Sequence, residues 1–282
     1  MKVLITGGTG YIGGAVLDAL VAAGHTVVAV SHEAARDEGI RARAAVAVRG
    51  DLRDPAGLAA LANDADAVIH AANTNGADAA ESDIAATRAF VTALAGSGKP
   101  LIYTSGVWVL GATGDDAADE GAPRNPIALV AWRAPLEEEV LKAPGVRGVV
   151  LRPAVVFGDD GGIPGMLARG ELPIVSDGTQ RVPLVHVRDL ADLYVRALGA
   201  PAESVLHGIA LTATVRELVG ALAPSLVPTA ISLEEARTSM GPFADALALD
   251  QVVSSKHTRA LLGWEPAREL EGGGVAVRGV RW

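Results

Sequence analysis

Cysteine is absent from this 282-residue sequence, and tyrosine occurs only three times. Without cysteine, disulfides, thiolate metal sites and cysteine nucleophiles are excluded. No apolar run reaches the roughly 20 residues that a membrane span needs. The first residues lead directly into an expected strand, which leaves no room for a signal peptide. These absences predict a soluble, cytoplasmic protein.

Basic residues are also in the minority, with 24 Lys and Arg against 33 Asp and Glu and a net charge of −9. This balance argues against nucleic acid or an anionic membrane surface as the partner. No group of His, Asp and Glu has the spacing of a metal site, so we predict no metal. A small-molecule partner is therefore expected, and the oligomeric state is left open.

Short β-branched runs alternate with longer amphipathic runs over the first part of the chain, which is typical of βαβ units and a parallel sheet. The pattern predicts strands at 2–6, 26–30, 45–48, 67–70, 100–104 and 147–151 and helices at 11–23, 55–61, 81–95 and 127–141. Pro55 suits the first turn of its helix, with Asp54 as the N-cap. We expect an α/β fold, a Rossmann-type doubly wound parallel sheet over residues 1–155.

Beyond Arg152-Pro153 the pattern becomes irregular, with clusters of Gly and Pro. Further helices are predicted at 189–198, 214–222, 233–239 and 255–262. Residues 156–282 are interpreted as mainly a smaller substrate lobe. The helix 189–198, with Asp189 as its expected N-cap, is predicted to pack back on the first domain.

A glycine motif links the first strand to the first helix, in the context that a dinucleotide loop requires. Such glycines allow a tight turn and a close approach to a pyrophosphate, which the free N–H groups of the helix terminus bind. The residues expected to contact the cofactor here are Gly7, Thr9, Gly10, Tyr11, Ile12 and Gly13.

Other residues expected at the cofactor follow later strands. Asp51 and Leu52 follow the third strand, where the carboxylate can accept a hydrogen bond from an adenine amino group or serve as a plain turn residue. His70, at a buried strand end, is interpreted as structural. The remaining expected contacts come from Ala71, Ala72, Asn73, Thr104, Pro153 and Val155.

The second strand ends in Val30-Ser31-His32, without an acidic residue at the place that binds the ribose 2′-hydroxyl of NAD. A 2′-phosphate would meet no repulsion there, and Ser31, His32 and Arg36 are candidate contacts. We therefore predict a preference for NADP(H) over NAD(H), although a solvated Arg36 is an equally ordinary interpretation.

In combination, these segments resemble the short-chain dehydrogenase/reductase superfamily in its extended and atypical branches. The resemblance also includes Tyr103-Thr104-Ser105-Gly106, the Arg152-Pro153 segment, Val185-His186-Val187-Arg188-Asp189 and Leu262-Gly263-Trp264-Glu265-Pro266, and so covers nearly the whole chain. It implies an NAD(P)-binding oxidoreductase.

The chemistry of that superfamily uses a Tyr acid/base, a Lys four residues later that lowers its pKa, and a Ser or Thr that orients the substrate oxygen. Here Leu129 and Arg133 take the Tyr and Lys positions, or Val130 and Ala134 in the neighbouring register. The hydroxyl position is Gly106. The candidate catalytic residues are therefore Ser105, Thr104 and Arg133.

Three functions are compatible with this pattern. The first is an atypical NAD(P)H-dependent ketoreductase whose proton comes from water, from Ser105 or from the substrate. Superfamily members without the tyrosine include ketoreductases that tailor polycyclic aromatic polyketides of the simocyclinone-type angucyclinone kind, which implies a role in antibiotic biosynthesis. The second is a non-catalytic redox sensor, and the third a sugar-nucleotide epimerase or dehydratase.

An aromatic or hydrophobic ketone would face a wall of Trp108, Trp132 and Phe157, each of which alone is typical of a core.

Overall fold

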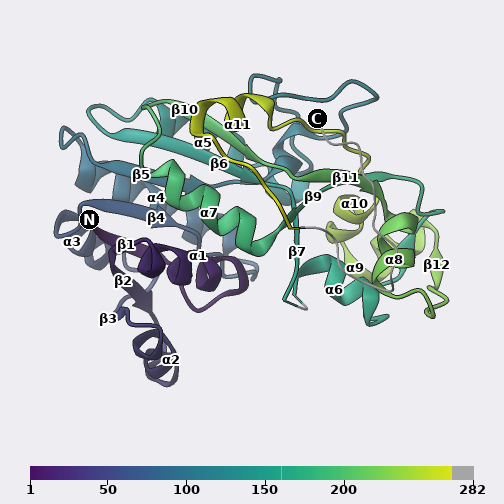
Figure 1. The fold of residues 1–282 in the computed structure, drawn as a ribbon, viewed down its shortest axis with the longest axis horizontal. Helices are drawn as coiled ribbons and strands as arrows, with labels where there is room; N and C mark the ends of the chain where they lie inside the picture. Colours follow the sequence, from purple (N-terminus) through teal and green to yellow (C-terminus); the bar gives the residue numbers. More distant parts are fainter. Residues whose placement is uncertain (160, 269–282) are drawn as a thin grey trace. The chain divides into compact units, whose positions relative to one another are not determined.

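The computed structural model describes residues 1–159 and 161–268, and within it the chain forms two compact units (Figure 1). Unit 1 comprises Met1–Ser105, Trp132–Leu151 and Leu190–Leu206. Unit 2 comprises Gly106–Ala131, Arg152–Asp189 and the described part of His207–Trp282. The expected domain boundary at residue 155 stays a prediction.

A parallel sheet forms the centre of unit 1. Its strand order is β10-β6-β5-β4-β1-β2-β3, and every neighbouring pair from β6 to β3 is parallel. The strands are β1 (Lys2–Thr6), β2 (Thr26–Ser31), β3 (Val46–Arg49), β4 (Ala67–His70), β5 (Pro100–Thr104), β6 (Arg147–Pro153) and β10 (Ser204–Gly208). This is the order of a doubly wound Rossmann-type sheet, so the predicted fold class is confirmed.

The helices of unit 1 pack apolar side chains against this sheet. They are α1 (Tyr11–Ala22), α2 (Asp37–Ala42), α3 (Pro55–Asn63), α4 (Ala79–Leu94), α5 (Arg133–Leu141) and most of α7 (Val187–Ala197). Phe90 and Leu94 of α4 are fully buried in one core cluster with Leu101 of β5. Asp54 caps α3 as predicted, because its carboxylate accepts a hydrogen bond from the backbone N–H of Gly57 at 3.0 Å.

The helix expected over 127–141 is shorter than predicted. Residues Ala128–Val130 form a 3-10 turn, and α5 begins only at Arg133. Pro135 explains the difference. In a helix that began at residue 127 it would lie in the interior and interrupt the hydrogen-bond ladder, whereas here it lies in the first turn, where its missing N–H costs nothing.

Unit 2 is built from short strands and short helices. The strands β7 (Val155–Phe157), β9 (Arg181–His186) and β11 (Leu211–Thr214) form one sheet, in which β7 and β9 are parallel and β9 and β11 antiparallel. The other elements are β8 (Ile174–Val175), β12 (Ala230–Ile231), α6 (Gly162–Ala168), α8 (Val215–Leu222), α9 (Leu233–Met240), α10 (Phe243–Leu247) and α11 (Lys256–Leu262). The three predicted helices of this region are confirmed as α8, α9 and α11. Among the helices that the structure describes, none is both long and apolar enough to cross a membrane.

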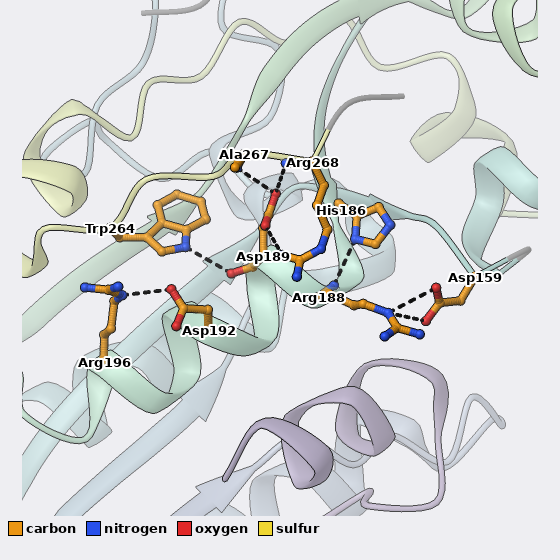
Figure 2. A network of polar contacts seen from close by, with 9 residues as sticks. All are labelled: Asp159, His186, Arg188, Asp189, Asp192, Arg196, Trp264, Ala267 and Arg268. Carbon is orange, nitrogen blue, oxygen red and sulfur yellow. Dashed lines mark hydrogen bonds and ion pairs between the residues drawn. The ribbon is translucent and has the colours of Figure 1, made fainter. Parts of the chain in front are cut away.

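The start of α7 holds the last described segment of the chain (Figure 2). The Asp189 carboxylate accepts hydrogen bonds from the backbone N–H groups of Ala267 (3.1 Å) and Arg268 (2.8 Å) and pairs with the Arg268 guanidinium. The indole N–H of Trp264 donates to the Asp189 carbonyl at 2.9 Å. The prediction of Asp189 as an N-cap was therefore wrong: α7 begins two residues earlier, at Val187, and the carboxylate binds residues from far along the chain.

Replacing Asp189 by Ala is expected to lower the free energy of unfolding by about 1–3 kcal/mol, because two backbone donors and an arginine lose a buried acceptor. Asp192, one turn later on α7, gives a matched control: it pairs with Arg196 at 2.8 Å, but both side chains are about half exposed. Asp192→Ala is expected to cost less than about 0.5 kcal/mol. Urea unfolding of both variants measures the difference, and equal effects would contradict this view of Asp189.

Candidate cofactor and carbonyl site

In the glycine loop between β1 and α1, an added Cβ would overlap with backbone atoms at Gly7 and Gly13, whereas at Gly10 it would make only one tight contact. Gly7 has a left-handed φ of +77°, and a Cβ there would lie 2.6 Å from the Ala71 carbonyl oxygen. A Cβ at Gly13 would lie 2.1 Å from the Gly7 carbonyl oxygen. At Gly10, by contrast, φ is −86° and the one protein atom near an added Cβ is the Gly7 oxygen, at 3.3 Å. The open side of Gly10 therefore fits the close approach of a ligand.

The start of α1 is suited to an anion. Its N-cap is Gly10, no side chain caps it, and the first turn carries no acidic residue. The first N–H groups of a helix lack partners within the helix and carry a partial positive charge. The pyrophosphate of a dinucleotide fits this loop, and the N–H groups here would hold it.

Charged side chains gather after β2, where the adenosine ribose of a dinucleotide binds in such sheets. Ser31 ends the strand, and its hydroxyl donates to the Glu33 carbonyl at 2.9 Å. The Glu33 carboxylate pairs with His32 at 3.2 Å and with Arg36 at 3.0 Å. Arg36 also reaches Thr9 of the glycine loop at 3.4 Å. Arg36 holds the pKa of Glu33 below its ordinary value, so the carboxylate stays ionised beside both candidate phosphate contacts.

The residues after β3 and β4 have local partners. Asp51 accepts a hydrogen bond from the Arg53 backbone N–H at 2.9 Å, which is the turn role that the sequence left open. Leu52 packs against the core of unit 1. Ala72 donates its N–H to the Thr6 hydroxyl at 3.3 Å, and the Asn73 side chain accepts the N–H of Asn75 at 2.8 Å. The two residues that follow β4, Ala71 and Ala72, have small side chains and lie next to Gly7 of the glycine loop.

A buried carboxylate, Asp83 of α4, joins the ends of two strands and the start of α5. It accepts hydrogen bonds from the Tyr103 hydroxyl and the Trp132 indole N–H, both at 2.8 Å. Its other oxygen lies 3.1 Å from Nε2 of His70. Burial alone raises the pKa of Asp83, but the hydrogen bonds from His70 and Trp132 and the positive charge of Arg133 outweigh it, and the pKa lies below its ordinary value.

The same network fixes the direction of the hydrogen bonds at the end of β4. Because the carboxylate of Asp83 accepts, Nε2 of His70 carries the proton and Nδ1 is free to accept from the Thr6 hydroxyl, 2.6 Å away. The Thr6 oxygen then accepts the N–H of Ala72. His70 is thus structural, as predicted, and it orients the backbone next to the glycine loop.

The three candidate catalytic residues meet at the end of β5. Arg133, the first residue of α5, donates through one guanidinium nitrogen to the carbonyls of Thr104 (2.6 Å) and Ser105 (3.1 Å). The Ser105 hydroxyl is buried and has no hydrogen-bond partner among the described residues, and the same holds for Nε of Arg133. Thr104 is occupied, because its hydroxyl lies 2.7 Å from that of Tyr194. Ser105 therefore retains a free hydroxyl at the end of this strand.

None of the three tyrosines offers an ionisable phenol at this place. The Tyr103 hydroxyl is bound to Asp83, and burial together with that carboxylate raises its pKa well above the usual value. Burial raises the pKa of Tyr194 as well. Tyr11 is the first residue of α1, which follows β1, and β4 lies between β1 and β5 in the sheet.

The remaining predicted site residues lie in other surroundings. Gly106 has an extended backbone, and a Cβ there would meet nothing within 4 Å, so the fold does not require glycine at the superfamily's hydroxyl position. Pro153 ends β6, and Val155 of β7 lines an apolar pocket of unit 2. Phe157 is buried against His186 in the core of unit 2, so the proposed aromatic wall lacks this member.

The family model described as "NAD dependent epimerase/dehydratase family" matches residues 3–209. The chain belongs to this family. The family is part of the extended short-chain dehydrogenase/reductase superfamily, whose members are generally oxidoreductases, and a nicotinamide cofactor fits the glycine loop of this member.

Relatives of this epimerase/dehydratase family member include an uncharacterised yeast protein, YLL056C of Saccharomyces cerevisiae, with 34% identity over 94% of this chain and 95% of that one. The 2-alkyl-3-oxoalkanoate reductase of Stenotrophomonas maltophilia is 28% identical over 72% of this chain and 66% of its own. Among solved structures, human epimerase family protein SDR39U1 with NADPH has a TM-score of 0.74 at 23% identity and covers 96% of both chains. That likeness shows the fold.

Two residues of this site were missed from the sequence. Glu33 stands next to His32 in the printed order, so a search one residue beyond the strand end would have found it. Asp83 gave a weaker signal. It is the one charged residue on the buried face of α4 among small and apolar residues, and its partners come from three distant segments.

Substitution of Gly10 and Gly13 by Ala is expected to separate cofactor binding from folding. Gly13→Ala forces a Cβ against backbone and should lower the melting temperature strongly. Gly10→Ala makes one tight contact, with the Gly7 oxygen, and should lower the melting temperature much less than Gly13→Ala. It should weaken NADPH binding about tenfold or more, because the added methyl group occupies the ligand's side of the loop. Calorimetric titration with NADPH checks this, and undiminished binding by Gly10→Ala would contradict the assignment of the loop.

Proposed function

We propose that this protein is an NAD(P)H-dependent reductase of ketones that works without a protein tyrosine acid. The proposal rests on the end of β5, where the buried Ser105 hydroxyl has no hydrogen-bond partner among the described residues and Arg133 holds the strand end in place. The proposed substrate is a hydroxyaryl ketone, of the kind found in polycyclic aromatic polyketides, whose phenol lies next to the carbonyl.

The reaction balances with the groups named. When bound, the nicotinamide supplies a hydride to the carbonyl carbon, and NAD(P)H becomes NAD(P)+. The Ser105 hydroxyl donates a hydrogen bond to the carbonyl oxygen and orients it, while the neighbouring phenol of the substrate gives the oxygen its proton. Arg133 keeps the carbonyls of Thr104 and Ser105 from turning toward the substrate, because its guanidinium occupies both. Placement of the reactants supplies much of the rate in this scheme.

Reduction is favoured over epimerisation or dehydration by the state of the tyrosines. Oxidation of an alcohol needs a base strong enough to remove its proton, and both buried phenols here are bound and have raised pKa values. Reduction of a ketone needs only an acid, which the substrate can bring. The relative named as a 2-alkyl-3-oxoalkanoate reductase supports a carbonyl substrate of this general kind.

We propose NADPH as the preferred cofactor, with Arg36 and His32 as the contacts of its 2′-phosphate. Glu33 opposes that preference, since it already pairs with both. Similar solved structures carry NADPH or NAD, so their likeness supports a nicotinamide cofactor of either kind. The balance between Arg36 and Glu33 would then set how strongly the protein prefers NADPH to NADH.

Replacing Glu33 and replacing Arg36 should shift the preference for NADPH over NADH in opposite directions. Glu33→Gln is expected to raise the ratio of NADPH to NADH affinity up to about fivefold, because a screened surface repulsion is removed. Arg36→Gln should weaken NADPH binding about tenfold and NADH binding less than twofold, because it removes a charge-assisted contact to phosphate. Dissociation constants for both cofactors measure this, and parallel changes for NADPH and NADH would refute the assignment.

Turnover with 4-deuterated NADPH and ortho-hydroxyaryl ketones is expected to place deuterium in the alcohol product, read by mass spectrometry. Methylation of the substrate phenol should lower kcat about 10²–10⁴-fold, the usual contribution of a positioned acid. With the unmethylated, phenol-bearing ketone, Ser105→Ala should lower kcat by less than about tenfold. A large loss in Ser105→Ala with no effect of methylation would make the serine the proton donor. Tight NADPH binding without transfer to any ketone would favour a sensor instead.

A further inference from the structure

The connection between β4 and α4 carries a pair of residues with a reactivity of its own, Asn75-Gly76. Among the four asparagines of the sequence, Asn75 alone is followed by glycine. In such a pair the backbone nitrogen of the glycine can attack the amide carbon of the asparagine side chain, because glycine has no Cβ to hinder the approach. The pair is therefore a candidate site for a spontaneous covalent modification.

Both reacting groups of this pair are accessible. Asn75 and Gly76 are exposed, and the Asn75 side-chain amide has no hydrogen-bond partner among the described residues. The Gly76 nitrogen lies 3.5 Å from the Thr74 hydroxyl oxygen, which is the outer limit for a hydrogen bond, so its N–H is weakly held. The nitrogen and the amide carbon can therefore meet through motion of a surface connection, while the core stays folded.

We propose that Asn75 is a site of spontaneous deamidation. The Gly76 nitrogen, once hydroxide has removed its proton, forms a bond to Cγ of Asn75, and the C–N bond of the side-chain amide breaks to release ammonia. Water then opens the resulting succinimide ring at either carbonyl, which gives aspartate or isoaspartate. The reaction uses neither an oxidant nor a reductant, and it adds one negative charge to a protein whose net charge is already −9.

The new carboxylate would lie near the candidate cofactor loop. A Cβ at Gly7 would lie 2.9 Å from the Ala72 Cα, so the start of the connection is in contact with that loop. Asn75 is three residues beyond Ala72, a length of chain that spans at most about 11 Å. Arg53, which reaches the same connection, already pairs with Asp78 at 2.8 Å. The added charge is therefore expected to repel the pyrophosphate of a dinucleotide bound at the loop.

Incubation of the purified full-length protein at mildly acidic and mildly alkaline pH tests the proposal. Peptide mapping by mass spectrometry should find Asn75 converted, faster at alkaline pH because hydroxide takes part, while the other asparagines stay intact. Gly76→Ala should slow the conversion about tenfold or more, because a Cβ beside the nitrogen hinders its attack. That Cβ would lie 2.9 Å from a carboxylate oxygen of Asp78, the end of a side chain that can turn away.

The effect on the cofactor is measured with Asn75→Asp, which reproduces one product, since Asp, like Asn, tolerates the left-handed φ of +53° found here. It should weaken NADPH binding about two- to fivefold at low salt and progressively less as salt is added. Asn63→Asp is the matched control, because it adds the same charge at the end of α3, before β4 and so at the opposite edge of the sheet. Asn75→Gly has no amide to lose and should keep its affinity on incubation.

Each outcome bears on a separate part of the inference. An Asn75 that stays intact at alkaline pH, or equal conversion in Gly76→Ala, would overturn the proposed reaction. Equal loss of affinity in Asn75→Asp and Asn63→Asp, or loss on incubation of Asn75→Gly, would overturn the effect on the cofactor. Because these measurements record only conversion and NADPH binding, failure to reduce any ketone would leave this inference standing.

Discussion

The buried carboxylate of Asp83 is the interaction on which the candidate site depends. An ionised carboxylate is costly to bury unless donors surround it, and here three side chains, from His70, Tyr103 and Trp132, supply those donors. Each donor stands next to a residue of the site: His70 precedes Ala71, Tyr103 precedes Thr104, and Trp132 precedes Arg133. The hydrogen bonds to the Asp83 carboxylate therefore fix the backbone at three separate places in the chain.

That arrangement also explains why the tyrosines cannot perform the superfamily's chemistry. Tyr103 stands at the end of a central strand, but its hydroxyl is needed by the carboxylate. Tyr194 lies against Thr104 and is fully enclosed. A phenol that stabilises a core is a poor acid or base, because ionisation would place a second charge in the same low-dielectric surroundings. In the proposed reduction the proton therefore comes from another source, and a substrate with its own phenol would supply it.

The sequence predicted the parallel sheet and the glycine loop well, because both follow from local patterns. Alternating strands and helices define the sheet, and the spacing of Gly7, Gly10 and Gly13 defines the loop. It predicted unit 2 less well, since β7, β8 and β12 are two or three residues long and carry little periodicity. The helix α5 begins later than the sequence predicts, because Pro135 fits the first turn of a helix but not its interior.

The sequence predicts those parts of the candidate site that depend on a local motif. It does not predict those that depend on contacts between residues far apart in the chain. Gly7 and Gly13 are required by contacts to backbone, which the motif encodes directly. Arg133 was found from its register, but its bonds to the Thr104 and Ser105 carbonyls depend on how α5 meets β5. Asp83 carries no motif, since its role exists only once the strands have brought its donors together. The sequence pattern thus identifies the candidate cofactor loop, and the fold identifies the residues that hold the neighbouring backbone in place.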